Sequence, residues 1–242
     1  MLFVILLAVV AVLAGGIAAV AGFGIGSLLT PMLALEAGTK VAVAAIAIPH
    51  FVATAQRFWM LRRHVDRRVL LGFGIASAVG GLIGALAHER ATSGALTMVF
   101  GVLLVLAAIS QLTGWMEHVR WGRSGAWTAG ALSGLLGGMV GNQGGIRSAA
   151  MLGFDVPKES FVATATAVAI FVDLARLPVY LAADWRAMLG VWPFVLIATV
   201  GAVVGTALGT RILGQIPQRV FRRVVALLLL ALGLAMLVAG AA

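Results

Sequence analysis

The stretch Gly22-Phe-Gly-Ile-Gly-Ser-Leu-Leu-Thr-Pro-Met-Leu33 places a cluster of glycines inside an apolar chain, and a related stretch, Gly141-Asn-Gln-Gly-Gly-Ile-Arg-Ser-Ala-Ala-Met-Leu152, follows 119 residues later. Glycine weakens a helix, and non-helical backbone at membrane depth is tolerated only where protein or a water-filled cavity satisfies its polar groups. Two broken segments at matching positions of two halves point to the binding site of a transporter. The doubled motif therefore predicts two broken helices that share a ligand site.

The composition places the chain in a membrane. Its 242 residues are 62% hydrophobic and 10% charged, and they include no cysteine. Apolar runs of about 18 residues or more are typical of transmembrane helices, and runs of this kind or slightly shorter cover 1–21, 41–61, 69–87, 94–113, 126–140, 160–182, 188–210 and 220–241. We expect an all-α integral protein with several membrane crossings and a single membrane domain, located in the cell inner (plasma) membrane.

The two halves of the chain align with each other. A shift of 119 residues pairs Gly22 with Gly141, Gly26 with Gly145 and Arg57 with Arg176. Each half therefore predicts a glycine-broken hairpin followed by three transmembrane helices. The first repeat covers 1–119, with a hairpin at 1–35 and helices at about 41–61, 69–87 and 94–113. The second covers 120–242, with a hairpin at 126–152 and helices at about 160–182, 188–210 and 220–241.

The distribution of basic residues predicts that the two repeats are inverted. If all eight runs simply crossed the membrane, the 14 lysines and arginines outside the apolar segments would divide equally between the two sides. If 1–35 and 126–152 are hairpins that return to the side they enter from, eleven of these residues lie on one side and three on the other. The second arrangement obeys the positive-inside rule. Because residues 1–21 alone are long enough to cross the hydrocarbon, a full crossing of that segment stays open.

The glycine motifs are the predicted substrate site. A helix that begins at a hairpin turn has unpaired N–H groups and a positive dipole end, and both favour an anion. Arg147 adds a cation, which is costly in lipid and whose planar donors suit sulfonate, sulfite or carboxylate. The predicted substrate-binding residues in the motifs are Gly22, Gly24, Gly26, Ser27, Thr30, Asn142, Gln143, Gly144, Gly145, Arg147 and Ser148. The alternative is that the glycines only pack helices and that Arg147 extends to water.

The helix after each hairpin carries further polar groups. Thr164 and Thr166 are predicted to contribute to substrate binding, and His50, Arg57, Asp173 and Arg176 are predicted to serve coupling or gating. Asp173 and Arg176 are three residues apart, so they can face each other on a helix. The alternatives are a structural ion pair, a packing histidine, and arginines that snorkel to the helix ends. We expect no cofactor and no metal, and the sequence contains no phosphate-binding loop for ATP.

The motifs resemble those of the sulfite exporter TauE/SafE family of membrane permeases. The resemblance is carried by Gly-x-Gly-x-Gly-x4-Pro-x-Leu at 22–33, by its echo at 141–152, where Ala150 replaces the proline, and by Ala-Thr-Ala-Thr at 163–166. It implies a secondary transporter that exports a small anion such as sulfite, sulfoacetate or another organosulfonate, and the paired halves suggest alternating access. A passive anion channel and an intramembrane enzyme remain alternatives. The expected partners are a small anionic substrate and the lipid bilayer, with no nucleic acid, and a homodimer stays open.

Overall fold

The structure is a computed structural model that describes residues 1–114, 123–141, 144, 147, 151, 154, 157–212 and 217–241. The elements it describes are helices: α1 (Leu2–Ala21), α2 (Ile25–Leu61), η1 (Arg62–His64), α3 (Arg67–Val69), η2 (Leu70–Gly74), α4 (Ile75–Arg90), α5 (Ser93–Thr113), α6 (Arg123–Val140), α8 (Lys158–Gly190), α9 (Trp192–Ile212) and α10 (Gln218–Ala241). Among the described residues, seven helices are long and apolar enough to cross a membrane, and Trp127–Val140 is a shorter apolar helix. The predicted all-α membrane class is confirmed.

Helix α2 contains a break that divides it into two helical segments. Gly38 has φ 74° and ψ 157°, which is not helical. The part before the break, residues 25–37, is about 20 Å long at 1.5 Å per residue, which is shorter than the hydrocarbon core of a bilayer. Residues 39–61 then form a membrane-length helix of their own. The chain therefore turns twice within 22–38, once at the glycine motif and once at Gly38.

Helix α8 is longer than the sequence predicted. We expected one helix to end at 182 and the next to begin at 188, because polar residues stand between them. The structure continues α8 to Gly190 and starts α9 at Trp192. The prediction was wrong because Asp184 and Arg186 are compatible with helical geometry, whereas Gly190 and Pro193 mark a true boundary.

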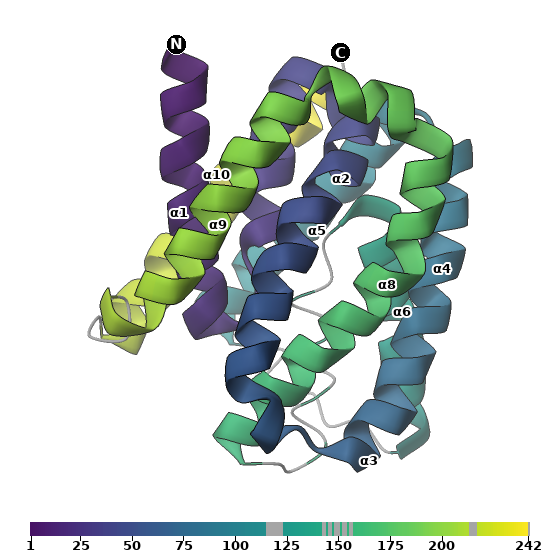
Figure 1. Cartoon of the computed structure of the whole chain (residues 1–242), viewed down its shortest axis with the longest axis vertical. Helices are drawn as coiled ribbons and strands as arrows, with labels where there is room; N and C mark the ends of the chain where they lie inside the picture. The colour runs from purple at the N-terminus through teal and green to yellow at the C-terminus, as the bar shows by residue number, and fades with distance from the viewer. Residues whose placement is uncertain are drawn as a thin grey trace.

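The helices pack in pairs, each with one helix from the first half of the chain and one from the second. Helix α1 lies along α9, α4 along α6, α5 along α10, and α2 against α8; Figure 1 shows the resulting bundle. Glycines bring two of these pairs together, since an added Cβ at Gly205 would overlap the carbonyl of Val12 and one at Gly134 would overlap the carbonyl of Ser77. Close backbone approach through small residues is how membrane helices commonly associate.

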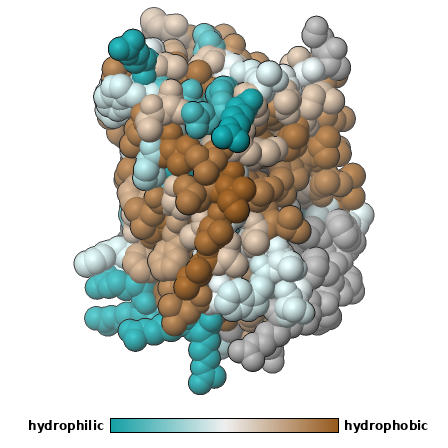
Figure 2. All heavy atoms as spheres, turned by 90° about the vertical axis from the view of Figure 1, so that its right-hand side faces the viewer, coloured by the Kyte–Doolittle hydropathy of each residue, from teal (hydrophilic) through white to brown (hydrophobic). Residues whose placement is uncertain are grey.

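The surface agrees with a membrane setting. In Figure 2 an apolar band covers the middle of the visible face, and hydrophilic residues gather at the two ends. Exposed leucines and valines, among them Leu82, Leu86 and Val79 of α4, contribute to the apolar exterior. Helix α3 lies at the bottom of Figure 1, and the N-terminus lies at the top.

Candidate functional site

Both glycine motifs begin where a helix ends inside the bundle. Gly22 closes α1 with φ 79°, and Gly141 follows α6 with φ 75°. The N–H of each glycine donates to the carbonyl four residues earlier, at 3.0 Å in both cases, which is Ala18 for Gly22 and Gly137 for Gly141. A left-handed residue after the last turn is the usual way a helix stops, and glycine adopts it without steric cost.

An arginine from another helix binds each of these helix ends. Arg57 donates through Nη1 to the carbonyl of Ala18, and Arg176 donates through Nη1 to the carbonyl of Gly137 at 2.6 Å. Each of these two carbonyl oxygens therefore accepts two hydrogen bonds, one from the N–H of the glycine that closes the helix and one from the arginine, which uses both of its lone pairs. Because both arginine side chains are buried, the interpretation that they snorkel to the surface is wrong.

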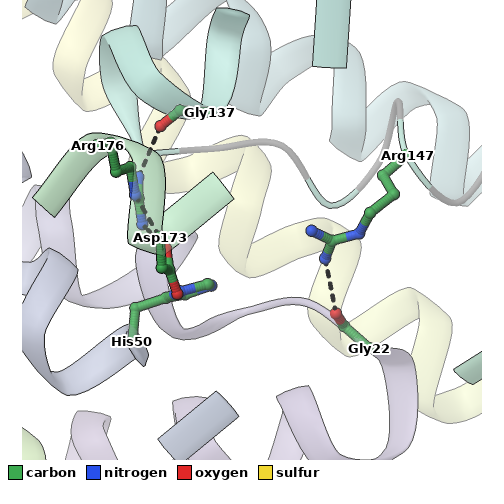
Figure 3. Close-up of polar contacts among 6 residues, drawn as sticks. All are labelled: Gly22, His50, Gly137, Arg147, Asp173 and Arg176. Carbon is green, nitrogen blue, oxygen red and sulfur yellow. Dashed lines mark hydrogen bonds and ion pairs between the residues drawn. The ribbon is translucent and has the colours of Figure 1, made fainter. Parts of the chain in front are cut away.

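Asp173 joins the two halves of the chain in one ion pair. Its Oδ1 accepts from Arg176 Nε at 2.9 Å and lies 2.8 Å from Arg176 Nη2. Its Oδ2 lies 2.7 Å from His50 Nδ1 on α2, as Figure 3 shows. The predicted facing of Asp173 and Arg176 is confirmed, and His50 has a buried carboxylate as its partner.

A small pocket lies where the two motifs meet. The residues that line it come from both motifs and from α2: Phe23, Gly24, Gly26, Ser27, His50, Gly141, Gly144 and Arg147. An added Cβ at Gly26 would overlap the carbonyl of Gly141, and one at Gly144 would overlap the side chain of Phe23. Glycines at these positions therefore let the two broken segments touch.

Arg147 has a guanidinium group that is only partly satisfied. The residue is 1% exposed, and its Nη2 donates to the carbonyl of Gly22 at 3.3 Å; Figure 3 shows the side chain reaching toward that carbonyl. Its Nε and Nη1 are buried and have no hydrogen-bond partner within the described part of the chain. Arg147 is therefore buried rather than snorkelling, contrary to the alternative interpretation.

Among the described residues around the pocket, buried positive charges outnumber buried negative charges. Arg57, Arg147 and Arg176 are buried, and among the described residues Asp173 is the one buried carboxylate. Arg57 donates to neutral groups, the Ala18 carbonyl and the Thr166 hydroxyl, the latter at 3.1 Å. Leaving a buried cation without a counter-charge is costly. The described site therefore carries an excess of buried positive charge, which a bound anion would neutralise.

The predicted substrate residues separate into three groups. Gly24, Gly26, Ser27, Gly144 and Arg147 line the pocket, and Gly22 contributes its carbonyl to Arg147. Thr30 is buried in α2 with a hydroxyl that has no partner among the described residues. Asn142, Gln143, Gly145 and Ser148 lie outside the described residues.

The two threonines of α8 are placed away from the pocket lining. Thr166 accepts a hydrogen bond from Arg57, so it acts on the arginine. Thr164 accepts from the backbone N–H of Asp66 at 2.9 Å and thereby fixes the connection before α3 to α8. We therefore do not assign Thr164 to the substrate.

Two buried polar residues, Tyr180 of α8 and His88 of α4, contact the end of α6, and the sequence predicted no site role for either. Tyr180 donates its hydroxyl to the carbonyl of Gly138, and His88 bonds to the carbonyl of Met139 through Nδ1 at 2.8 Å. His88 lies one residue beyond the apolar run 69–87 and beside Glu89 and Arg90, so no sequence pattern assigns it to the interior. Its burial depends on the contact between α4 and α6, which the sequence alone does not specify.

Comparison with known proteins identifies the family. Residues 7–236 match the family model described as sulfite exporter TauE/SafE. The searches of curated proteins and of solved structures gave no match. Members of the matched family are transporters and not enzymes. With seven membrane-length helices in the part of the chain that the structure describes, and a match over nearly its whole length, the chain is a multi-pass membrane protein that belongs to the sulfite exporter TauE/SafE family.

Proposed function

We propose that the chain is a secondary transporter that exports a small anion such as sulfite, sulfoacetate or another organosulfonate, and that it binds the anion in the pocket between the two glycine motifs. The observation that carries this proposal is the buried guanidinium of Arg147, whose Nε and Nη1 have no partner among the described residues. A planar guanidinium with free donors matches two oxygens of a sulfonate, sulfite or carboxylate.

The start of α2 supports the same assignment. Gly24 is the N-cap of α2 and has no side chain that could cap the helix, and Gly24, Gly26 and Ser27 line the pocket. The first N–H groups of a helix and its positive dipole end attract anions. An oxyanion held between this helix start and Arg147 would receive donors from both halves of the chain.

We assign coupling or gating to His50, Arg57, Asp173 and Arg176. His50 lines the pocket and is bonded to Asp173, which also binds Arg176. Arg57 and Arg176 hold the ends of α1 and α6. An anion that approaches the pocket competes with Asp173 for the surrounding positive charge, and this competition can release the helix ends during transport.

We further propose that residues 1–119 and 120–242 are inverted repeats that alternate access to the pocket. Equivalent contacts support this proposal. Arg57 binds the carbonyl of Ala18 as Arg176 binds that of Gly137, and both pairs are related by the 119-residue shift. The first hairpin helix, α1, packs on α9, as α6 of the second packs on α4.

Flux measurements test the proposed substrate site. We expect purified protein in liposomes to release sulfite or sulfoacetate, and we expect Arg147→Ala to lower the flux by about tenfold or more because a charged partner of the anion is lost. Arg147→Lys keeps the charge but not the planar fork, so it should retain part of the flux. Arg186→Ala removes an exposed arginine of α8 and serves as the control. Wild-type flux in Arg147→Ala would refute the site.

A second measurement separates a carrier from a passive channel. A carrier that alternates access shows saturation and counterflow, in which a substrate gradient on one side drives labelled substrate against its own gradient. We expect both with sulfite or sulfoacetate. Linear flux without counterflow would replace alternating access by a channel.

A further inference from the structure

The ring of His88 has a fixed tautomer. His88 lies in α4 with its side chain 1% exposed, and its Nδ1 is 2.8 Å from the carbonyl oxygen of Met139. A carbonyl oxygen can only accept a hydrogen bond, so Nδ1 must hold a hydrogen. In the neutral ring the second nitrogen, Nε2, then has a lone pair and no hydrogen.

The lone pair faces a carboxylate. His88 Nε2 is 3.8 Å from Oδ2 of Asp184 on α8, and both atoms are buried without a hydrogen-bond partner among the described residues. With a neutral ring and an ionised carboxylate, two acceptors confront each other away from water, which is unfavourable. One proton added to the pair turns this into a charge-assisted contact.

From this geometry we propose that His88 and Asp184 form a proton-binding site that couples anion export to the proton gradient. The inference rests on the proposed function, because it supplies the coupling ion of that transporter. The ligand is a single proton held on the imidazole, 3.8 Å from the carboxylate that balances its charge.

The groups around the pair come from three helices. Lys40 of α2 acts on His88 electrostatically and donates through Nζ to the carbonyl of Glu89, next to the histidine. From α8, the ring of Tyr180 lies 4.9 Å from the His88 ring, and Arg176 stands one turn before Tyr180. From α6, the contact is the Met139 carbonyl. Asp184 and the Met139 carbonyl therefore favour a charged histidine, whereas burial and Lys40 oppose it.

The proton can reach the pair from one end of the bundle. The side chain of Asp184 is 14% exposed, while that of His88 is 1% exposed. The three basic residues that the inverted arrangement leaves on the side poor in positive charge, which the positive-inside rule makes the external side, are Lys40, Arg90 and Arg186. Asp184 is therefore the entry group, and His88 is the inner group.

The end of α6 connects this pair to the anion site. Three successive carbonyls of α6 are held from outside the helix: Gly137 by Arg176, Gly138 by Tyr180 and Met139 by His88. The chain continues from there to Gly141 and Arg147, which line the pocket. A protonated His88 donates a stronger hydrogen bond than a neutral one, so proton binding stabilises this position of the helix end.

The His88–Asp184 site lies between the two halves, and on the Asp184 side it has no counterpart in the other repeat. The 119-residue shift that relates Arg176 to Arg57 relates Tyr180 to Leu61 and Asp184 to Val65, which are apolar. A proton taken up at this pair would therefore act on the Arg147 hairpin and not on the first hairpin. Only one of the two hairpins, the one that carries Arg147, would then respond to the proton, and it would act as the proton-sensitive gate of the transport cycle.

The test measures protons and anions together. Liposomes that contain the protein, internal sulfite or sulfoacetate, and the pH dye pyranine report both fluxes. The variants are His88→Asn, whose amide N–H can still reach the Met139 carbonyl but cannot take a proton, and Asp184→Asn. We expect both to keep anion exchange within about twofold of wild type and to lose about tenfold or more of the linked proton movement. His64→Asn and Glu36→Gln change exposed residues and serve as matched controls.

Each outcome decides between the two proposals. If wild type and His88→Asn move protons with the anion equally, the inference is overturned and the transport function stands. If wild type releases neither anion faster than empty liposomes, the proposed function fails, and the proton site is judged by melting temperatures between about pH 5.5 and 8.5. A pH dependence that both variants lose supports the site, and identical profiles in wild type and His88→Asn overturn it.

Discussion

Asp173 is the residue on which the charge balance of the site depends. Within the described ranges it is the one buried carboxylate, and it stands near Arg57, Arg147 and Arg176, all of which are buried. A buried ion pair adds less to stability than its Coulomb energy suggests, but breaking one leaves an uncompensated charge. Asp173 therefore makes the empty site tolerable, and a bound anion would add the second counter-charge.

Replacing Asp173 by Asn should destabilise the protein strongly. The substitution keeps an acceptor for Arg176 but removes the negative charge, and breaking a buried pair costs roughly 3–5 kcal/mol. We expect a large fall in melting temperature in detergent, with partial recovery in the double variant Asp173→Asn, Arg176→Gln, where the unpaired cation is also removed.

The control for this prediction is Glu36→Gln, which neutralises an exposed carboxylate of α2. It should melt close to wild type because exposed charges contribute little to stability. If the Asp173→Asn protein has the same melting temperature as this control, Asp173 does not balance the charge of the buried arginines.

Contacts at the residue scale were only partly predictable. Asp173 and Arg176 are three residues apart, so helical geometry predicts their contact from sequence. His50 and Asp173 are 123 residues apart in sequence, and their contact depends on how α2 packs on α8. No local pattern contains that information, and a lone histidine in an apolar helix was therefore open to interpretation as a packing residue.

At the scale of elements, two helix pairs depend on backbone contact. In the pair α4 and α6, Gly134 meets the carbonyl of Ser77, and in the pair α1 and α9, Gly205 meets the carbonyl of Val12. Without a hydrophobic driving force between helices in lipid, close packing and small residues determine association. These two contacts hold the first arm of each proposed hairpin against a helix of the other half.

Gly134→Ala and Gly205→Ala should therefore each weaken a helix pair. The added Cβ would overlap backbone that cannot move aside without shifting a helix, and overpacking of this kind costs about 1–3 kcal/mol. We expect lower melting temperatures for both variants. Gly94→Ala in α5 has open space around its Cβ and should not show the loss. If Gly134→Ala and Gly94→Ala have the same melting temperature, the close contact of α4 with α6 is wrong.

The number and approximate position of the helices were predictable from the sequence where the segment must cross lipid. A spanning segment must satisfy its backbone internally, so long apolar runs become helices, and the runs in the sequence correspond to helices in the structure. Helix ends were less predictable. The break at Gly38 and the continuation of α8 through Asp184 depend on which helices pack around these residues, and hydropathy does not report packing.

At the scale of the whole molecule, the positions of the basic segments test the proposed inversion. The chain contains no cysteine, so a single introduced cysteine reports its own location. With inverted halves, Arg63→Cys and Arg223→Cys should react with a membrane-impermeant maleimide only after the cell membrane is opened, whereas Glu36→Cys and Arg186→Cys should react in intact cells. If every apolar run simply crossed, Arg63 would share a side with Arg186, and Glu36 would share a side with Arg223. Labelling of Arg63→Cys and Arg223→Cys from opposite sides would therefore exclude inverted repeats, and with them alternating access by two equivalent halves.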